Sequence, residues 1–355
     1  MKKGVGLIKK LALAFGPTSC EGEVIAAIKE ELKGLPIELE EDRMGNLTAH
    51  LKGPEGAPRI MLSAHTDEVG LMITEIEEEG FLRFDKLGGI NNSVLVGRSV
   101  ILGDETRRIP GVIAARGIHV QGADERKRET DFKDMYIDIG TNSREETEAL
   151  LERGDFGVFD TPFVLMGEQG EYLACKALDD RLGCALLIEV LREIAECQLP
   201  LDLWFCFTVR EEIGRSGAGV TANRIRPDVA IVLETTAIAD LPEVEKARRV
   251  AKVGGGGVIS LVDRSTIYDR ALVDFALSVA QREGIDVQVK QYVSGGNDAA
   301  RIQPTNTGVR CLALSAATRY LHAPVSLAAV HDYEAMKALL VAILNQWEKG
   351  GELHA

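Results

Sequence analysis

Three nearly continuous apolar runs, at residues 59–64, 201–209 and 229–233, constrain the fold of this chain most strongly. Runs of this kind, with little polar alternation, are typical of strands that are buried on both faces of a sheet. After residue 175 such strands alternate with helical patterns, as at residues 180–196. The alternation predicts an α/β fold, in which a mixed sheet is flanked by helices on both faces.

A segment of different character interrupts this pattern. Residues 73–165 contain short alternating strands separated by turn signals, with one helical stretch at residues 143–153. We therefore expect a small β-rich, barrel-like domain inserted into a discontinuous catalytic domain that consists of residues 1–72 and 166–355. The length of 355 residues accommodates one large and one small domain.

The composition excludes several classes of protein. A net charge of -14 leaves no electrostatic footprint for nucleic acid, and no apolar run reaches the roughly 18 residues of a membrane helix. The N-terminus begins like a signal peptide, but Lys9 and Lys10 interrupt its apolar stretch, so we expect a cytoplasmic protein. The six cysteines form no Cys-x-x-Cys pair and are predicted to be reduced, mostly buried thiols.

Acidic and histidine side chains follow the apolar runs, at the strand ends where α/β sheets bind ligands. A buried charge there is unfavourable unless it is paired or bound to a metal ion. Three carboxylates and two imidazoles are the ligand types that a pair of zinc-like or cobalt-like ions prefers, and a further glutamate is left over as a base. The candidates are His65, Asp67, Asp179, Asp180, Glu211, Glu212, Glu234 and His322.

The first two motifs also have simpler interpretations. His65 and Asp67 point to one side of a strand end, so Asp67 either orients the imidazole toward a metal ion or caps an exposed turn. Asp179 and Asp180 precede a helix, where capping acids are common. One aspartate shared between two cations, however, explains why the pair directly follows an apolar segment.

The remaining acids and His322 are ambiguous when taken singly. Glu211 and Glu212 are either a solvated loop pair or a base beside a metal ligand, since adjacent carboxylates need different environments to differ in role. Glu234 and His322 could each be ordinary loop residues. Their joint occurrence at successive strand ends favours a metal site over these separate readings.

Two glycine-rich stretches remain. Residues 254–257 lack the Lys-Ser/Thr of a phosphate loop and the full Gly-x-Gly-x-x-Gly pattern, which argues against nucleotide binding. The stretch that contains Gly296 and Asp298 either approaches the substrate closely or is a plain turn. We therefore keep Gly296, Asp298 and Asp180 as candidates for contact with the substrate or for support of the site.

Five ordered motifs resemble those of the dinuclear-metal aminopeptidases that assemble into tetrahedral, dodecameric particles. This is the glutamyl and deblocking aminopeptidase family, some members of which were once labelled cellulase M. The resemblance covers nearly the whole chain, and its motifs are AHTDEVG at 64–70, KALDDRLG at 176–183, EEIG at 211–214 followed by Gly217-Ala218, GGNDA at 295–299 and RYLHAP at 319–324.

The resemblance implies a role for each ligand. His65 and Glu234 hold one metal ion, Glu212 and His322 hold the second, and Asp179 bridges both ions. The family most often has Asp at the place of Glu234. Glutamate is one methylene longer and is still an oxygen ligand, so this departure bears on metal spacing or preference.

The resemblance also implies a mechanism. Asp67 orients His65, a cis peptide bond joins Asp179 to Asp180, and Glu211 is the general base. Two divalent ions, zinc or cobalt first and manganese as a further option, lower the pKa of a shared water whose proton Glu211 accepts and then gives to the leaving amine. The implied enzyme is an aminopeptidase acting on peptide substrates, built as a dodecamer from dimers that the inserted domain holds together.

Three alternatives stay open at this point. A metal-dependent deacylase or other amidohydrolase could use the same motif order. A glycoside hydrolase needs two carboxylates but no metal, and so leaves His65 and His322 unexplained. A non-catalytic assembly subunit would not need the intact Glu211. The preferred N-terminal residue of the substrate is not fixed by the sequence.

Overall fold

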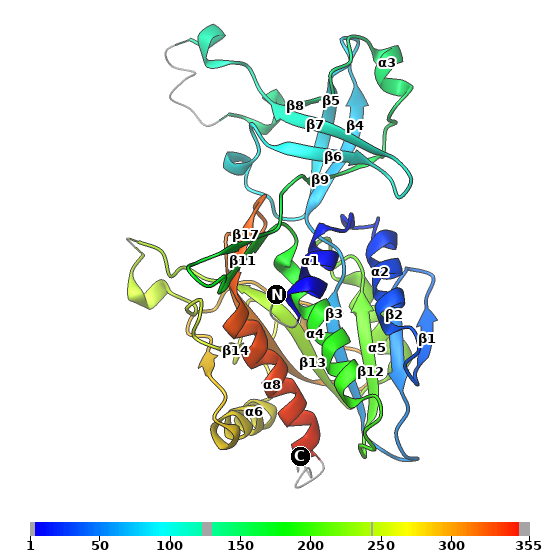
Figure 1. The fold of residues 1–355 in the computed structure, drawn as a ribbon, viewed down its shortest axis with the longest axis vertical. Coiled ribbons are helices and arrows are strands. Elements are labelled where there is room, and N and C mark those ends of the chain that lie inside the picture. Colours follow the sequence, from blue (N-terminus) through cyan, green and yellow to red (C-terminus); the bar gives the residue numbers. More distant parts are fainter. Residues whose placement is uncertain (1–3, 123–129, 243, 348–355) are drawn as a thin grey trace.

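The computed structural model describes residues 4–122, 130–242 and 244–347. Within these ranges eleven strands form one large mixed sheet, and six others form a closed barrel (Figure 1). The large sheet runs in the order β1 (Glu38–Glu41), β2 (Leu47–Leu51), β12 (Asp202–Thr208), β3 (Arg59–His65), β13 (Val229–Ala237), β16 (Arg310–Arg319), β17 (Ser326–Ala329), β11 (Tyr172–Cys175) and β10 (Val164–Met166), with β14 (Gly257–Ile259) and β15 (Val287–Val289) continuing from β16.

The apolar runs of the sequence form the centre of this sheet. β12 pairs in parallel with β3, β3 with β13, and β13 with β16. Every residue of β3 except Arg59 is buried. Because the four strands are parallel, their carboxyl ends meet at one edge, which is where the candidate site residues follow them.

Helices cover both faces of the sheet, as predicted. On one face α4 (Leu178–Ile194) packs against β3 and β13, with α1 (Val5–Leu13), α2 (Gly22–Leu32) and α8 (Val330–Trp347) beside it and α6 (Arg270–Glu283) next to α8. On the other face α5 (Ser216–Ile225) and α7 (Ala299–Ile302) contact each other and the central strands (Figure 1). The predicted α/β fold class is confirmed.

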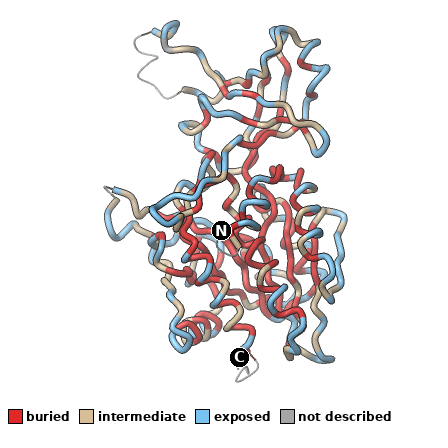
Figure 2. Tube along the Cα trace, in the orientation of Figure 1, coloured by how far each residue is buried: buried red, intermediate tan, exposed pale blue. Residues whose placement is uncertain are grey.

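The inserted segment forms a barrel with its own apolar core, at one end of the molecule (Figures 1 and 2). Its strands close in the order β4 (Gly70–Ile76), β5 (Leu82–Leu87), β8 (Tyr136–Asp138), β7 (Arg108–Ala114), β6 (Ser99–Gly103) and β9 (Phe156–Phe159). Strand β10 begins inside the expected insertion at 73–165, ends one residue beyond it, and pairs with β11 in the large sheet. The expected domain boundaries stay a prediction, and the barrel strands themselves span residues 70–159.

Several local expectations differ from the structure. The helix expected at 143–153 is the shorter α3 (Arg144–Glu148), capped by Ser143, and α1 and α5 were not foreseen. Aspartate is favoured at helix N-termini, so the sequence predicts that the last helix begins at Asp332, but it begins at Val330. The Asp332 carboxylate accepts hydrogen bonds from the backbone N–H groups of Gly254 and Gly256. It thereby fixes the glycine-rich loop before β14.

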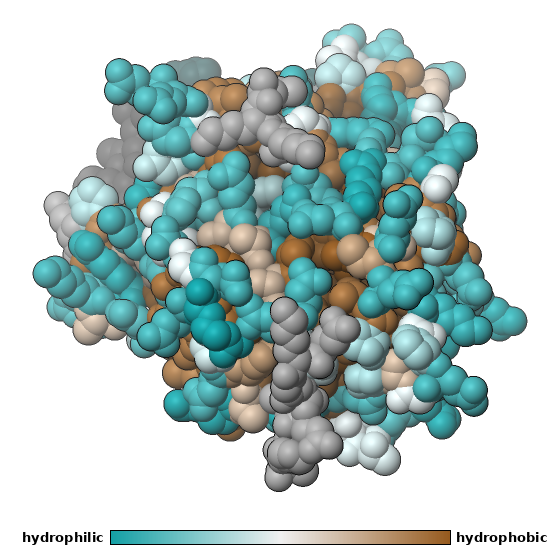
Figure 3. Space-filling model, turned by 60° about the horizontal axis from the view of Figure 1, so that its bottom comes forward, coloured by the Kyte–Doolittle hydropathy of each residue, from teal (hydrophilic) through white to brown (hydrophobic). Residues whose placement is uncertain are grey.

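The surface carries few large apolar areas on the side that Figure 3 shows. The face opposite the barrel is mostly hydrophilic, with smaller hydrophobic areas between the hydrophilic side chains (Figure 3). No helix in the described ranges combines the length and the apolar character needed to cross a membrane. All six cysteines are free, and five are buried while Cys197 is exposed.

Candidate metal centre

The candidate residues come from separate elements and meet at one edge of the large sheet. His65 ends β3, Glu211 and Glu212 follow β12, Glu234 lies in β13, His322 follows β16, and Asp179 lies in the first turn of α4. Long stretches of chain separate them in sequence. The parallel arrangement of the central strands brings them together, as the sequence predicted.

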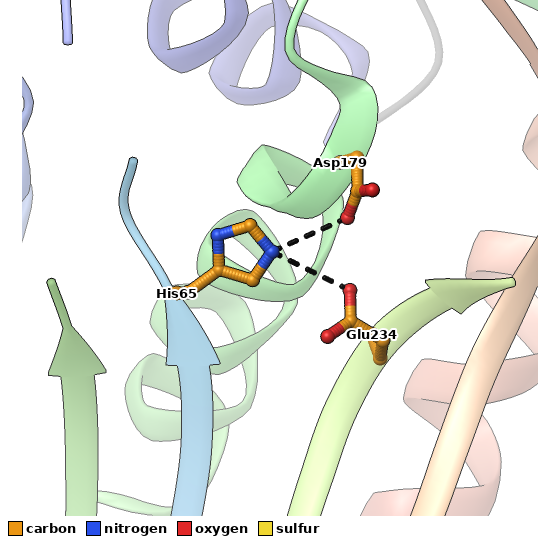
Figure 4. Close-up of side chains that lie close together, drawn as sticks. All are labelled: His65, Asp179 and Glu234. Carbon is orange, nitrogen blue, oxygen red and sulfur yellow. Dashed lines mark hydrogen bonds and ion pairs between the residues drawn. The ribbon is translucent and has the colours of Figure 1, made fainter. Parts of the chain in front are cut away.

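The first group of possible metal ligands is buried. His65 Nε2 lies 3.3 Å from Asp179 Oδ1 and 3.6 Å from Glu234 Oε1 (Figure 4). All three side chains point toward one point between β3, β13 and the start of α4 (Figure 4). One imidazole nitrogen and two carboxylate oxygens are a donor set that zinc or cobalt accepts.

The second group shares Asp179 with the first. His322 Nε2 lies 3.4 Å from Asp179 Oδ2 and 3.2 Å from Glu212 Oε2. In each group the donor atoms lie within 4.8 Å of one another. The two oxygens of Asp179 thus face different histidines, which is the arrangement expected of a carboxylate between two ions. We call these two sets, with Asp179 common to both, the metal-binding groups, after the ions that they could hold.

The carboxylates of these two groups are crowded together, so added positive charge would stabilise them. Burial, together with the nearby Asp179 and Asp180, raises the pKa of Glu234 well above its usual value, and burial raises the pKa of Glu212 to about 7. Burial also opposes ionisation of Asp179, but His322 and His65 hold its pKa well below the usual value. Crowded buried carboxylates are unfavourable unless cations balance them, so the residues fit a pair of divalent ions.

Asp67 lies directly behind His65. The Nδ1 atom of His65 is 3.1 Å from the backbone oxygen of Asp67 and 3.4 Å from its Oδ1. A proton on Nδ1 serves this contact and leaves Nε2 for a metal ion. The Asp67 carboxylate also accepts hydrogen bonds from the hydroxyl of Thr18 at 2.6 Å and from the backbone N–H groups of Glu211 and Glu212 at 2.9 and 3.1 Å. The buried side chain of Asp67 therefore positions the imidazole of His65 as well as the backbone of Glu211 and Glu212.

Glu211 belongs to neither metal-binding group. It lines the cavity beside them, and its Oε1 accepts a hydrogen bond from Arg215 Nε at 2.7 Å. Burial raises the pKa of Glu211, while His65 and Arg215 act in the opposite direction. The contact with Arg215 was not predicted from the sequence, although the i to i+4 spacing is compatible with it.

The three remaining candidates divide into one cavity residue and two supporting ones. Gly296 lines the cavity, and a side chain there would collide with Ser265 and approach Arg215, so the backbone passes closely at this point. The peptide bond between Asp179 and Asp180 is cis, and the buried Asp180 accepts a hydrogen bond from the backbone of Gly183. Asp298 is buried as well, and its Oδ2 accepts a hydrogen bond from the hydroxyl of Thr208.

A second set of buried charges lies next to the metal-binding groups and was missed in the sequence. Glu68 Oε1 lies 2.7 Å from Lys176 Nζ and 3.4 Å from an Arg181 nitrogen, and all three side chains are buried. Lys176 also donates to the backbone oxygen of Ala14, and Arg181 to those of Leu11, Ala14 and Gly16. We call these three charged residues the paired cluster. Their hydrogen bonds hold the end of α1 and the residues that follow it against the site.

The metal-binding groups open into a cavity of about 830 Å³. His65, Asp179, Glu211, Glu212, Glu234 and His322 all line it. A cavity of this size accommodates a small substrate or the end of a peptide.

The chain matches a known family over most of its length. A sequence model of the family described as M42 glutamyl aminopeptidase matches residues 45–339. A putative aminopeptidase of Acetivibrio thermocellus is 36% identical over 338 residues, which cover 95% of this chain and 97% of the relative. A lysyl aminopeptidase of Pyrococcus furiosus is 32% identical, with 96% of each chain covered.

Solved structures agree with the sequence matches. A TET aminopeptidase from the marine sediment archaeon Thaumarchaeota archaeon SCGC AB-539-E09 has a TM-score of 0.94 at 35% identity, covering 98% of this chain and 97% of that one. The TET1 peptidase of Pyrococcus horikoshii, which can assemble into a tetrahedron or a large octahedral shell, has a TM-score of 0.87 at 35% identity and covers 96% and 99%. The resemblance found in the motifs is confirmed, and the chain belongs to the M42 glutamyl aminopeptidase family of peptide-bond hydrolases.

Proposed function

We propose that this protein binds two divalent metal ions and removes N-terminal residues from peptides. The observation that carries the proposal is the position of Asp179 between two histidines, with Oδ1 toward His65 and Oδ2 toward His322. His65, Asp179 and Glu234 would hold one ion, and Asp179, Glu212 and His322 the other. When bound, such ions lower the pKa of water and polarise a carbonyl group.

Glu211 is the base in this proposal. Arg215 Nε holds its Oε1, so we expect Oε2 to accept the proton of the attacking water and later to give it to the leaving amine. The hydrogen bonds of Asp67 to the backbone N–H groups of Glu211 and Glu212 keep base and ligand at a fixed separation. The carboxylates of the cavity would also hold the free amine of the peptide, which makes cleavage exo-acting.

The proposal extends to metal, assembly and location. Zinc or cobalt suits the mixture of imidazole and carboxylate donors, and manganese is also compatible. We propose that the barrel domain mediates dimers and that these build a homo-oligomer, a dodecamer by analogy with the tetrahedral particle described for the Pyrococcus horikoshii relative. We also propose a cytoplasmic location, as the lysines near the N-terminus led us to expect.

The decisive experiment is hydrolysis of a panel of aminoacyl-p-nitroanilides after chelation and again after addition of zinc or cobalt. We expect the chelated protein to be inactive and the metal to restore cleavage. Turnover of N-acylated amino acids alone would replace the aminopeptidase proposal with the deacylase alternative.

The role of Glu211 is tested separately. Glu211→Gln should keep both ions and the stability of the wild type but lower kcat by about 10²- to 10⁴-fold, the range for general acid–base catalysis. Metal content, thermal unfolding and kcat are measured on the same preparation. The exposed Glu30→Gln variant, which removes the same charge from α2, is the control. Wild-type kcat in Glu211→Gln would remove this residue from the mechanism.

A further inference from the structure

We propose that Thr18 and Glu21, which lie between α1 and α2, are positioning residues for the reaction of this enzyme. Neither residue belongs to the five motifs, and the match to the family model begins at residue 45. We call residues 14–21 the α1–α2 linker. Through the loops that follow β3 and β12, the linker would hold the metal-binding groups and the base. The inference therefore rests on the proposed function.

The linker is attached by its backbone to the loop that follows β3. The N–H group of Glu68 donates a hydrogen bond to the oxygen of Gly16 at 3.0 Å, and that of Thr18 donates to the oxygen of Glu68 at 3.1 Å. Pro17, between Gly16 and Thr18, forms an isolated parallel β-bridge with Glu68. Because the backbone is held on both sides of Pro17, the side chain of Thr18 leaves the linker in a defined direction.

The hydroxyl of Thr18 completes the contacts of the Asp67 carboxylate. It donates to Oδ2 at 2.6 Å, and both side chains are buried. Burial opposes ionisation of Asp67, but hydrogen bonds from His65 and Thr18 help to lower its pKa. Without the hydroxyl, Oδ2 would keep one donor among the described residues, the backbone N–H of Glu212. The carboxylate would then be less well fixed, and so would the imidazole that it orients.

Glu21 holds the loop that follows β12. Its Oε1 accepts hydrogen bonds from the backbone N–H groups of Ser19 at 2.8 Å and of Arg210 at 3.2 Å. Ser19 and Arg210 have φ angles of 76° and 59°, which are unfavourable for residues with a side chain. Such conformations persist where the surrounding structure holds them. The Glu21 carboxyl group thereby fixes the turn at Arg210, which directly precedes Glu211.

Two carboxyl groups together hold three consecutive backbone N–H groups of the loop after β12. Glu21 accepts the hydrogen bond of Arg210. Asp67 accepts those of Glu211 and Glu212. Burial raises the pKa of Glu21 to about 7, and the two acids are close enough for the charge of Asp67 to add to this effect. A misplacement of about 1 Å near a catalytic centre can lower the rate by about 100-fold. The linker therefore supports catalysis by fixing this loop.

The first test separates the hydroxyl of Thr18 from its shape. Thr18→Val keeps the shape but removes the donor, so we expect kcat to fall by about 10- to 100-fold with KM nearly unchanged, the range for a residue that supports a ligand. Thr18→Ser restores the donor and should recover most of the activity. The measurements are kcat and KM for the aminoacyl-p-nitroanilide that the metal-loaded wild type cleaves fastest, and thermal unfolding of each variant.

A double-mutant cycle tests whether Thr18 acts through Asp67. In the Asp67→Asn background we expect Thr18→Val to cause no further loss of kcat, because the group that the hydroxyl holds is already changed. The visible absorption spectrum of the cobalt-loaded protein gives a readout that needs no turnover. It should differ from the wild type in Thr18→Val and match the wild type in Thr18→Ser. A hydroxyl that only stabilised the fold would leave the spectrum of the folded variant unchanged.

Glu21 is tested in the same way. Glu21→Gln keeps an oxygen that accepts the N–H groups of Ser19 and Arg210 and should retain most of the activity. Glu21→Met removes this acceptor and should lower kcat by about tenfold. The matched control is Thr147→Val in the barrel. It removes a similarly buried hydroxyl, which donates to the oxygen of Gly80 at 2.8 Å, and should lower stability but not kcat.

The outcomes separate this inference from the proposed function. A wild-type kcat and cobalt spectrum in Thr18→Val, or an equal loss of kcat in the wild-type and Asp67→Asn backgrounds, would overturn the inference and leave the aminopeptidase intact. If no aminoacyl substrate is cleaved with metal bound, the proposed function fails, and the cobalt spectra alone decide about positioning. If Thr18→Val does not fold, Thr18→Ala removes the same hydroxyl and takes its place.

Discussion

The metal-binding groups and the paired cluster are two sets of buried charge at the same edge of the sheet, and they are balanced in different ways. In the paired cluster one carboxylate, Glu68, meets the cations of Lys176 and Arg181, and backbone oxygens take the remaining donors. In the metal-binding groups three carboxylates face two imidazoles. The first set has its partners inside the chain, since backbone oxygens accept the donors that Glu68 does not. The second set has an excess of carboxylates, which the proposed divalent ions would balance.

This difference distinguishes buried charges that stabilise the fold from buried charges that favour a ligand. A buried ion pair that is complete within the chain fixes a conformation, and removing one partner leaves an uncompensated charge. A buried cluster with an excess of one sign favours a ligand of the other sign.

The largest effect on stability is expected from breaking the paired cluster. Glu68→Ala leaves the buried Lys176 and Arg181 without a carboxylate and should lower the free energy of unfolding by about 3–5 kcal/mol. Urea unfolding of the metal-free protein measures this loss. The double variant Glu68→Leu with Lys176→Met removes both members of a pair and should recover part of the stability. Equal losses in the single and double variants would show that the cluster does not act through charge balance.

The opposite effect on stability is expected from the metal-binding groups. Glu234→Gln relieves a carboxylate whose pKa is raised by burial and by the neighbouring Asp179 and Asp180, so the metal-free protein should gain about 1 kcal/mol. The same variant should lower kcat/KM by about 10²-fold because it weakens one metal site. Unfolding in a chelator, metal content and kcat/KM are the measurements.

Glu234→Asp is the matched control. It keeps the carboxylate and should therefore bind both ions and retain most activity. A metal-free Glu234→Gln protein that is less stable than the wild type would contradict the view that these carboxylates repel one another.

The sequence predicted those features that depend on local pattern. Continuous apolar runs identified β3, β12 and β13, and the residues after them identified the members of the metal-binding groups, because parallel strands share one carboxyl edge. The division between a sheet domain and a barrel also followed from a change in periodicity. Residue types and strand ends therefore sufficed to predict which side chains meet, and their binding of metal ions stays a prediction.

The features that the sequence missed depend on contacts between distant segments. Glu68 lies next to Asp67 in a motif, but its partner Lys176 is more than a hundred residues away and carries no local sign of burial. Asp332 has the sequence signature of a helix cap, yet tertiary packing turns its carboxylate toward Gly254 and Gly256.

Asp332 offers a third way of balancing buried charge, and its predicted effect depends on pH. Its carboxylate is held by two backbone N–H groups, and burial, which outweighs these hydrogen bonds, raises its pKa to about 6. The native state thus binds a proton more tightly than the unfolded state, so the contribution of Asp332 to stability falls as the pH rises through this range. Between pH 5 and 7.5 the loss should be about 1–2 kcal/mol. Because other acids titrate here too, the measurement is the difference in unfolding free energy between the wild type and Asp332→Asn at each pH. A difference that stays constant with pH would mean that backbone donors alone balance a buried carboxylate as well as the cations of the paired cluster do.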